Sequence, residues 1–178
     1  INDTEFLITF SYGRGLQASA LKEFGKNQDN LESIEKAFNH RAKMNGLSSQ
    51  GKWSENLEKE GYKIKDMGTY STESVDYPDF IHPISKAINN AEYKQGIILC
   101  GSGNGAQMTA NKYPNVRAGL CWTNEQAMLT RQHNNANILA LPGRFVNNEL
   151  ALEMVHTYLN TAFEGGRHQT RVEKINKI

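Results

Sequence analysis

The chain has 178 residues and a formal net charge of +1, with 20 basic and 19 acidic side chains, which is enough for one domain with a sizeable core. This even balance and the lack of a basic run argue against a nucleic acid or a membrane surface as partner. No apolar stretch approaches the roughly 18 residues of a spanning helix, so no membrane span is expected.

The two cysteines, Cys100 and Cys121, are too few for a disulfide framework, and neither belongs to a Cys-x-x-Cys pattern. Together with the absence of a signal-peptide pattern, this favours a reducing, cytoplasmic compartment. No metal-ligand motif such as His-Glu-x-x-His is present, so neither a metal nor another cofactor is expected.

The first predicted element is a short strand at residues 5–10, broken by glycines at 13 and 15. Helices are predicted at 16–24 and from about 30 to 44, where apolar residues recur at helical spacing. The polar loop 46–54 is the candidate junction between an N-terminal segment, residues 1–53, and a main domain, residues 54–178.

Beyond the junction, predicted strands alternate with predicted helices. The further strands are expected at residues 62–67, 96–100, 116–121 and 138–141. The helices are expected at residues 54–60, 80–90, 106–112, 124–132, 148–159 and 167–178. Alternation of this kind predicts an α/β fold with a mostly parallel five-stranded sheet that is covered on both faces.

The stretch 96–105 organises this pattern, because an apolar strand stops abruptly at Cys100 and three glycines follow within five residues. Without Cβ atoms, such a turn lets the backbone approach a ligand and aims N–H groups at an anion. A thiol beside these N–H groups suits acid–base chemistry next to an anion hole. The alternative is that Cys100 is a small buried residue before a tight turn.

Two further places carry candidate site residues. His133, with Asn134 and Asn137, stands in a predicted polar turn just before a strand, which favours a site over an ordinary turn histidine. Arg167 and Arg171 are four residues apart, so they share a helix face and suit a phosphate, although a basic face is also common on a solvated helix. Other polar residues are interpreted as structural: Asp76 and Asp79 as helix caps, Cys121 as core, and His40, His82, His156 and His168 as surface or core residues.

Four segments, in order, give the chain a specific resemblance. They are residues 68–79, 96–105, 131–137 and 163–171. Residues from about 56 to 178 resemble the type B ribose-5-phosphate isomerases and the related galactose-6-phosphate and allose-6-phosphate isomerases. The resemblance implies a Rossmann-like three-layer fold, a homodimer with active sites between subunits, and aldose–ketose isomerisation of a phosphorylated sugar.

Carried over by position, the resemblance gives each candidate a role. Cys100 would move a proton between C1 and C2, and His133 would assist ring opening. Asn134 would bind sugar hydroxyls. The enediolate oxygen would be held by Ser102 and by backbone amides of Gly101, Gly103, Asn104 and Gly105. The phosphate would be held by Arg144, Arg167 and Arg171, some of them from the partner subunit.

The first fifty residues depart from this family, whose first strand normally ends in Asp-His-Ala-Gly. Residues 7–53, on the segments 7–22 and 40–52, instead resemble the C-terminal part of class I fructose-bisphosphate aldolases. In that family Ser11, Gly13 and Arg14 would be phosphate-binding positions, but the Schiff-base lysine has no counterpart here, which disfavours aldol cleavage.

An empty central slot would expose two strand edges, so we expect residues 6–10 to dock in parallel between 62–67 and 96–100, with Arg14 near the ligand. The alternative is a separate helical arm. The expected function is interconversion of ribose 5-phosphate and ribulose 5-phosphate. The alternatives are a poorly active sugar-phosphate-binding or assembly domain, because the Asp-His motif is missing, and isomerisation of a six-carbon sugar phosphate.

Overall fold

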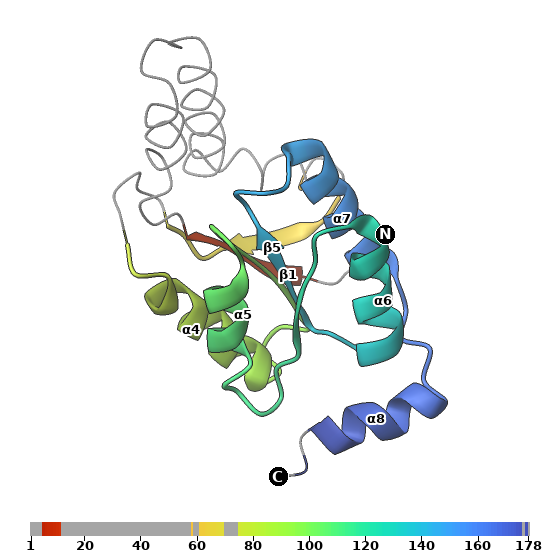
Figure 1. Ribbon diagram of the computed structural model, residues 1–178. Helices are drawn as coiled ribbons and strands as arrows, with labels where there is room; N and C mark the ends of the chain where they lie inside the picture. Colours follow the sequence, from red (N-terminus) through yellow and green to blue (C-terminus); the bar gives the residue numbers. More distant parts are fainter. Residues whose placement is uncertain (1–4, 12–57, 59–60, 70–74, 176, 178) are drawn as a thin grey trace, which may run out of the picture.

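The middle layer of the molecule is a parallel sheet, seen edge-on among the helices in Figure 1. The computed structural model describes residues 5–11, 58, 61–69, 75–175 and 177. The strands in this part of the chain are β1 (Glu5–Ser11), β2 (Lys63–Asp66), β3 (Gln95–Cys100), β4 (Ala118–Leu120) and β5 (Ile138–Pro142). They lie in the order β2-β1-β3-β5-β4, and each neighbouring pair is parallel, so their carboxyl ends meet at one edge.

Helices cover both faces of this sheet. One face carries α4 (Tyr77–Asn89) and α5 (Asn104–Ala110), and the other carries α6 (Asn124–Asn134) and α7 (Asn148–Asn160) (Figure 1). The last helix, α8 (Arg167–Ile175), stands off from the sheet and packs against α6. A buried apolar cluster fills each side of the sheet, which confirms the predicted three-layer α/β fold.

Strand β1 lies in the interior of the sheet between β2 and β3, as expected from its sequence. Its residues pair with β2 on one side and with β3 on the other, with Ile8 opposite Asp66 and Ile97. Leu7 and Ile8 are both buried, and they enter the apolar clusters on opposite faces of the sheet. A strand buried on both faces needs a continuous apolar run, and this requirement explains why residues 6–10 do not alternate with polar ones.

The remaining expectations for the N-terminal segment lie outside the described residues. These are the helices at 16–24 and 30–44, most of the helix at 54–60, and the junction near residue 53. The division into two segments therefore stays a prediction. In the described part of the chain, no helix is both long and apolar enough to cross a membrane.

Three predicted helix boundaries were wrong, and the first two matter for the site. The expected polar turn at 133–137 begins too early, because α6 continues through Asn134 and ends only where Asn135 adopts a left-handed conformation, with φ of 47°. Helix α4 begins at Tyr77 rather than at residue 80, with Asp76 at the N-cap position, but its side chain accepts no capping hydrogen bond. Helix α8 ends at Ile175, before the expected residue 178.

Because Ile8 is fully buried in the central strand, Ile8→Ala should lower the free energy of unfolding by about 2–5 kcal/mol. Ile8→Val, which removes one methylene, should cost about 0.5–1.5 kcal/mol. Urea denaturation of both variants measures these differences. Equal stability of Ile8→Ala and the wild type would contradict the central placement of β1.

Candidate functional site

Cys100 lies at the carboxyl edge of the sheet, at the point where the order of the strands changes direction. Strand β2 is added on one side of β1 and β3 on the other, so the switch point falls between β1 and β3. Cys100 ends β3 and pairs in register with Ser11 of β1 and Pro142 of β5. Open α/β sheets bind their ligands at this position.

The glycine loop turns back toward the sulfur of Cys100. The backbone N–H of Gly103 donates a hydrogen bond to Cys100 Sγ, at 3.2 Å, and that of Asn104 donates to Ser102 Oγ, at 3.4 Å. Gly103 has a φ of 76°, and a Cβ added there would lie 2.3 Å from Leu120 Cδ1. A backbone N–H that donates to the sulfur favours negative charge there, so the loop suits a thiolate or a ligand oxyanion.

Arg144 reaches the same loop from the end of β5. Its backbone N–H donates to the carbonyl of Gly101, and the N–H of Gly143 donates to that of Cys100, both at 3.0 Å. The guanidinium lies over Gly101, since a Cβ there would be 2.9 Å from Arg144 Nε. The absent side chain of Gly101 therefore leaves the room that Arg144 occupies beside Cys100.

Tyr77 is a residue at this edge that sequence reasoning missed. A Cβ on Gly105 would lie 2.6 Å from its hydroxyl oxygen, so the phenol packs directly on the glycine loop. In this segment the sequence analysis interpreted only Asp76 and Asp79, as helix caps. The one signal in the sequence was a large aromatic residue near the start of a predicted helix; in the structure Tyr77 is 39% exposed.

His133 and Asn134 lie at the opposite edge of the sheet from Cys100. Helix α6 begins after the carboxyl end of β4 and returns to the amino end of β5, so its last turn reaches the amino edge (Figure 1). The turn that follows is fixed there, because the backbone N–H of Gly96, at the start of β3, donates to the carbonyl of Asn137 at 2.9 Å. Four residue steps along β3, roughly 13 Å, separate the two edges.

Arg167 and Arg171 belong to this second group, because α8 packs against α6. The candidate residues therefore divide into two sets. The carboxyl edge holds Cys100, Ser102, Gly101, Gly103, Asn104, Gly105 and Arg144. The amino edge holds His133, Asn134, Arg167 and Arg171. Arg14 lies outside the described residues, and within one chain the two sets do not meet.

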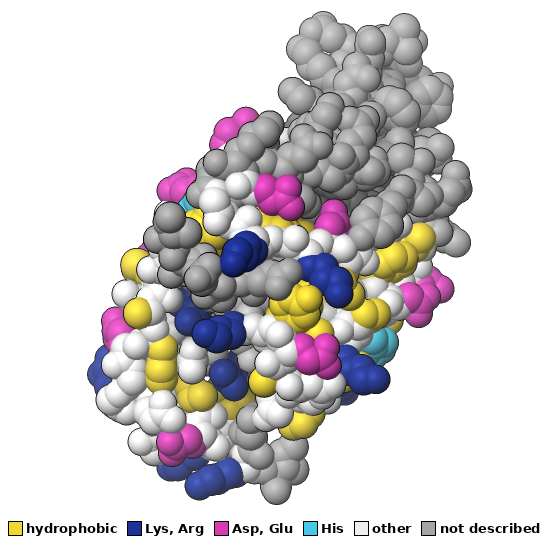
Figure 2. Space-filling model, turned by 180° about the vertical axis from the view of Figure 1, so that it is seen from behind, with side chains coloured by type: hydrophobic (Ala, Val, Ile, Leu, Met, Phe, Trp, Pro, Cys, Tyr) yellow, Lys and Arg dark blue, Asp and Glu magenta, His cyan; other side chains and the backbone are white. Residues whose placement is uncertain are grey.

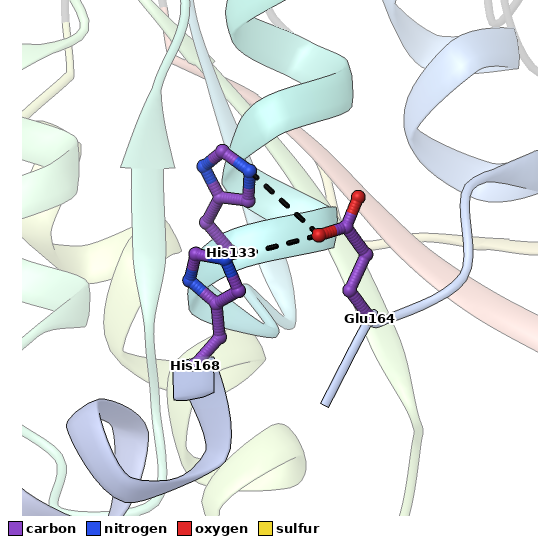
Figure 3. Close-up of side chains that lie close together, drawn as sticks. All are labelled: His133, Glu164 and His168. Carbon is purple, nitrogen blue, oxygen red and sulfur yellow. Dashed lines mark ion pairs between the residues drawn. The ribbon is translucent and has the colours of Figure 1, made fainter. Parts of the chain in front are cut away.

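A compact cluster surrounds His133 (Figure 3). Its ring stacks on that of His168, with centroids 4.2 Å apart and planes 3° from parallel. The Oε2 atom of Glu164 lies 3.9 Å from Nε2 of His133 and 3.8 Å from Nε2 of His168. Burial lowers the pKa of His168, and the charges of His133, Arg167 and Arg171 lower it further against the opposing effect of Glu164.

These three side chains are the group with metal-ligating atoms closest together among the described residues, all within 4.8 Å of one another. The donor types would suit a transition-metal ion. However, an imidazole binds a metal along the lone pair in its own plane, and two parallel stacked rings do not direct their lone pairs at one ion. The geometry therefore favours a stacked pair of rings beside a carboxylate over a preformed metal site.

The turn behind His133 is held rigidly by Arg131. Its guanidinium donates to the carbonyls of Ala136, at 2.6 Å, and Thr161, at 3.3 Å, and to the side chain of Asn135, at 3.1 Å. These bonds tie the carboxyl ends of α6 and α7 together. Helix carboxyl ends carry partial negative charge, so a guanidinium at their meeting point is stabilised without a carboxylate.

The remaining candidates take structural places. Cys121 is buried and burial raises its pKa to about 12, so it stays a neutral thiol. His82 contacts the hydroxyl of Tyr113 at 2.9 Å, and His156 lies beside the ring of Tyr62. On the face shown in Figure 2, Lys, Arg, Asp and Glu side chains are interspersed, and neither sign of charge gathers into one large patch.

The fold is that of an α/β protein with an open parallel sheet, and the carboxyl edge of this sheet holds the candidate site around Cys100. The model of the family described as Ribose/Galactose Isomerase matches residues 42–175, and the chain belongs to that family. This confirms the resemblance seen in residues 56–178. A second model, that of class-I fructose-bisphosphate aldolase, matches residues 2–73 and covers the segment that departs from the isomerases.

Individual relatives agree with this assignment. Ribose-5-phosphate isomerase B of Escherichia coli is 42% identical over 122 residues, which are 68% of this chain and 82% of the relative. A ribose 5-phosphate isomerase of Thermotoga maritima superposes with a TM-score of 0.73 at 37% identity, covering 99% of this chain and 100% of that one. The Mycoplasma genitalium enzyme with bound ribulose 5-phosphate gives 0.69 at 30% identity, covering 97% and 95%.

The glycine loop requires a residue without a side chain at position 103, which can be tested. An alanine there must adopt a left-handed conformation and also displace Leu120, so we expect Gly103→Ala to destabilise the fold by about 2–4 kcal/mol. Gly61→Ala is the matched control, because Gly61 has a φ of 92° but nothing within 4 Å of the added Cβ. It should lose only the conformational part, about 1–2 kcal/mol. Similar losses in both variants would contradict the close packing at Gly103.

Proposed function

We propose that the protein is an aldose–ketose isomerase that interconverts ribose 5-phosphate and ribulose 5-phosphate through an enediolate. The observation that carries the proposal is the thiol of Cys100, which accepts a hydrogen bond from the backbone N–H of Gly103 in a glycine loop at the switch point of the sheet. Membership of the ribose/galactose isomerase family and the names of its relatives support this substrate class.

In this mechanism Cys100, as thiolate, removes the proton from C2 of the open-chain aldose. The C2–H electron pair forms the C1–C2 double bond, and the carbonyl pair moves onto O1, where the loop amides and Ser102 stabilise the negative charge. The O2 proton passes to O1, and the thiol returns its proton to C1, which leaves a carbonyl at C2. A preorganised set of backbone donors is worth several kcal/mol to such a charged intermediate.

Ring opening precedes this step. His133 donates a proton to the ring oxygen while the bond between that oxygen and C1 breaks. The proton of the O1 hydroxyl leaves to water, and C1 becomes the aldehyde carbon. Asn134, next to His133, is placed to hold sugar hydroxyls.

The three candidate arginines are available for the phosphate. Arg144, Arg167 and Arg171 make no ion pair with any described residue, although one guanidinium–carboxylate pair is a common arrangement for an arginine. Their donors match a phosphate bidentately. The phosphate site thus supports a monophosphorylated sugar over an unmodified one.

The separation of the two residue sets argues for a shared site. Cys100 and His133 lie at opposite edges of one sheet, too far apart for one sugar to contact both within a chain. A site that uses both residues therefore takes the carboxyl-edge set from one chain and the amino-edge set from another. We therefore propose a homodimer in which the carboxyl edge of one protomer faces the amino edge of its partner. A twofold interface would build two such sites at once.

The first test is turnover of ribose 5-phosphate by the full chain. Cys100→Ala should lose at least about 10³-fold in kcat, because no other group replaces the base, while phosphate ligands still bind. Cys121→Ala is the control and should retain turnover. Near-normal kcat in Cys100→Ala would end the assignment. Ligand binding without turnover in the wild type would favour the binding-domain alternative, and preference for galactose or allose 6-phosphate the six-carbon alternative.

The phosphate assignment has its own test. Replacing Arg167 or Arg171 with Ala should raise KM by roughly 10–150-fold, which corresponds to about 1.5–3 kcal/mol of charge-assisted hydrogen bonding. Lys174→Ala, a charge change on the same helix, should leave KM within about twofold. Normal KM in both arginine variants would mean that α8 is only a solvated helix.

Sharing of the site is tested by mixing two inactive variants, Cys100→Ala and His133→Asn. If each site takes Cys100 from one chain and His133 from the other, a mixed dimer holds one intact site. After denaturation and refolding at equal amounts, activity should return to about a quarter of the wild type, since half the dimers are mixed. If no activity returns while mixed dimers are present, both residues act within one chain.

A further inference from the structure

We propose that Glu164 is a positioning residue that holds the proton of His133 on Nε2, with the ring of His168 as the neutral surface on which His133 lies. The inference deepens the proposed function and rests on the role of His133 in ring opening. It concerns Glu164, which the sequence analysis did not single out, and His168, which it interpreted as a surface or core residue.

The hydrogen bonds around His168 decide which histidine Glu164 serves. Arg167 Nε donates to Nε2 of His168 at 3.4 Å, so this nitrogen presents its lone pair and not a proton. A carboxylate gains nothing from a lone pair. Although Glu164 is as near to His168 as to His133, only His133 has an Nε2 that is free to carry a proton toward it.

Because the two rings are stacked, only one of them is expected to carry a positive charge. Parallel rings whose centroids lie 4.2 Å apart would repel one another if both were charged. His168 has a side chain that is 6% exposed, whereas that of His133 is 37% exposed. Charge avoids burial, so the shared positive charge belongs on the outer ring.

Backbone contacts hold Glu164 beside His133. Its backbone N–H donates to the carbonyl of Gln132 at 3.1 Å, which fixes it beside the last turn of α6 (Figure 3). Gly165 and Gly166 follow with left-handed φ values of 67° and 52°, and they turn the chain back so that His168 comes under His133. Of the described residues, the titratable and charged groups that act on His168 are His133, Arg167, Arg171 and Glu164, and Glu164 also lies within ion-pair distance of His133.

The chemical consequence concerns the other nitrogen of His133. Nε2 of His133 lies on the side of Glu164, at an ion-pair distance of 3.9 Å, so Nδ1 is the atom left to present the second proton of the imidazolium to the sugar. The carboxylate favours this charged form, whereas Arg167 and Arg171 oppose it until a phosphate occupies them. Bound phosphate and Glu164 thus act in the same direction on His133.

The test uses the full chain and the variants Glu164→Gln and Glu164→Asp. Glu173→Gln is the matched control, because this carboxylate is exposed on α8 and accepts from Gln169 at 2.8 Å. Histidine ring ¹⁵N NMR should show His133 protonated on Nε2 and His168 with a lone pair on Nε2. In Glu164→Gln the share of His133 protonated on Nε2 should fall, and Glu164→Asp should recover part of it.

Kinetics give the second readout. An acid must keep its proton, so the alkaline limb of kcat for ribose 5-phosphate should move to lower pH in Glu164→Gln and stay unmoved in Glu173→Gln. A merely structural role would lower kcat equally at all pH values. An unshifted limb together with an unchanged tautomer of His133 would overturn the inference, as would a His168 protonated on Nε2.

The two proposals fail separately. Absence of turnover in the wild type, with the expected NMR result, would reject the isomerase function and leave the placement of the proton intact. Normal wild-type turnover with a Glu164→Gln variant identical to wild type in both readouts would reject the positioning role alone.

Discussion

The fold depends on the central slot of a parallel sheet being filled. A strand in that slot is hydrogen-bonded on both sides and buried on both faces, so its loss would expose two strand edges and two apolar layers at once. Here β1 fills the slot, with Leu7 and Ile8 entering the two layers. These residues come from the segment that matches the aldolase model rather than the isomerase model. The slot therefore accepts a strand of different sequence, provided that the strand is a short apolar run.

The same strand positions the candidate active edge. Ser11 and Pro142 flank Cys100 in register, and the glycine loop then folds back so that Gly103 meets the sulfur. The edge was predictable from the sequence because its signal is local: an apolar run, a thiol, and glycines in direct succession. The central placement of β1 was predictable for a different reason, since few segments of the chain could satisfy the slot.

What the sequence could not provide is contact between segments far apart in the chain. Tyr77 lies on Gly105 because α4 packs beside α5, and His168 lies under His133 because α8 returns to the end of α6. No spacing rule connects residues 133 and 168. Cys100 and His133 lie at opposite edges because α6 runs from the carboxyl edge of the sheet to its amino edge. The alternation of strands and helices implied this direction, but the helix was predicted to end at residue 132, which put His133 in a turn instead of in the last turn of α6.

The two edge strands have a consequence for behaviour at high concentration. Strand β4 spans only Ala118–Leu120, and β2 spans Lys63–Asp66 with both of its lysines exposed. An exposed sheet edge is a template on which another chain can add a strand, and short or charged edges resist such pairing. This sheet therefore ends on both sides in segments that offer few backbone groups for intermolecular β-pairing, which guards the native state against edge-to-edge aggregation.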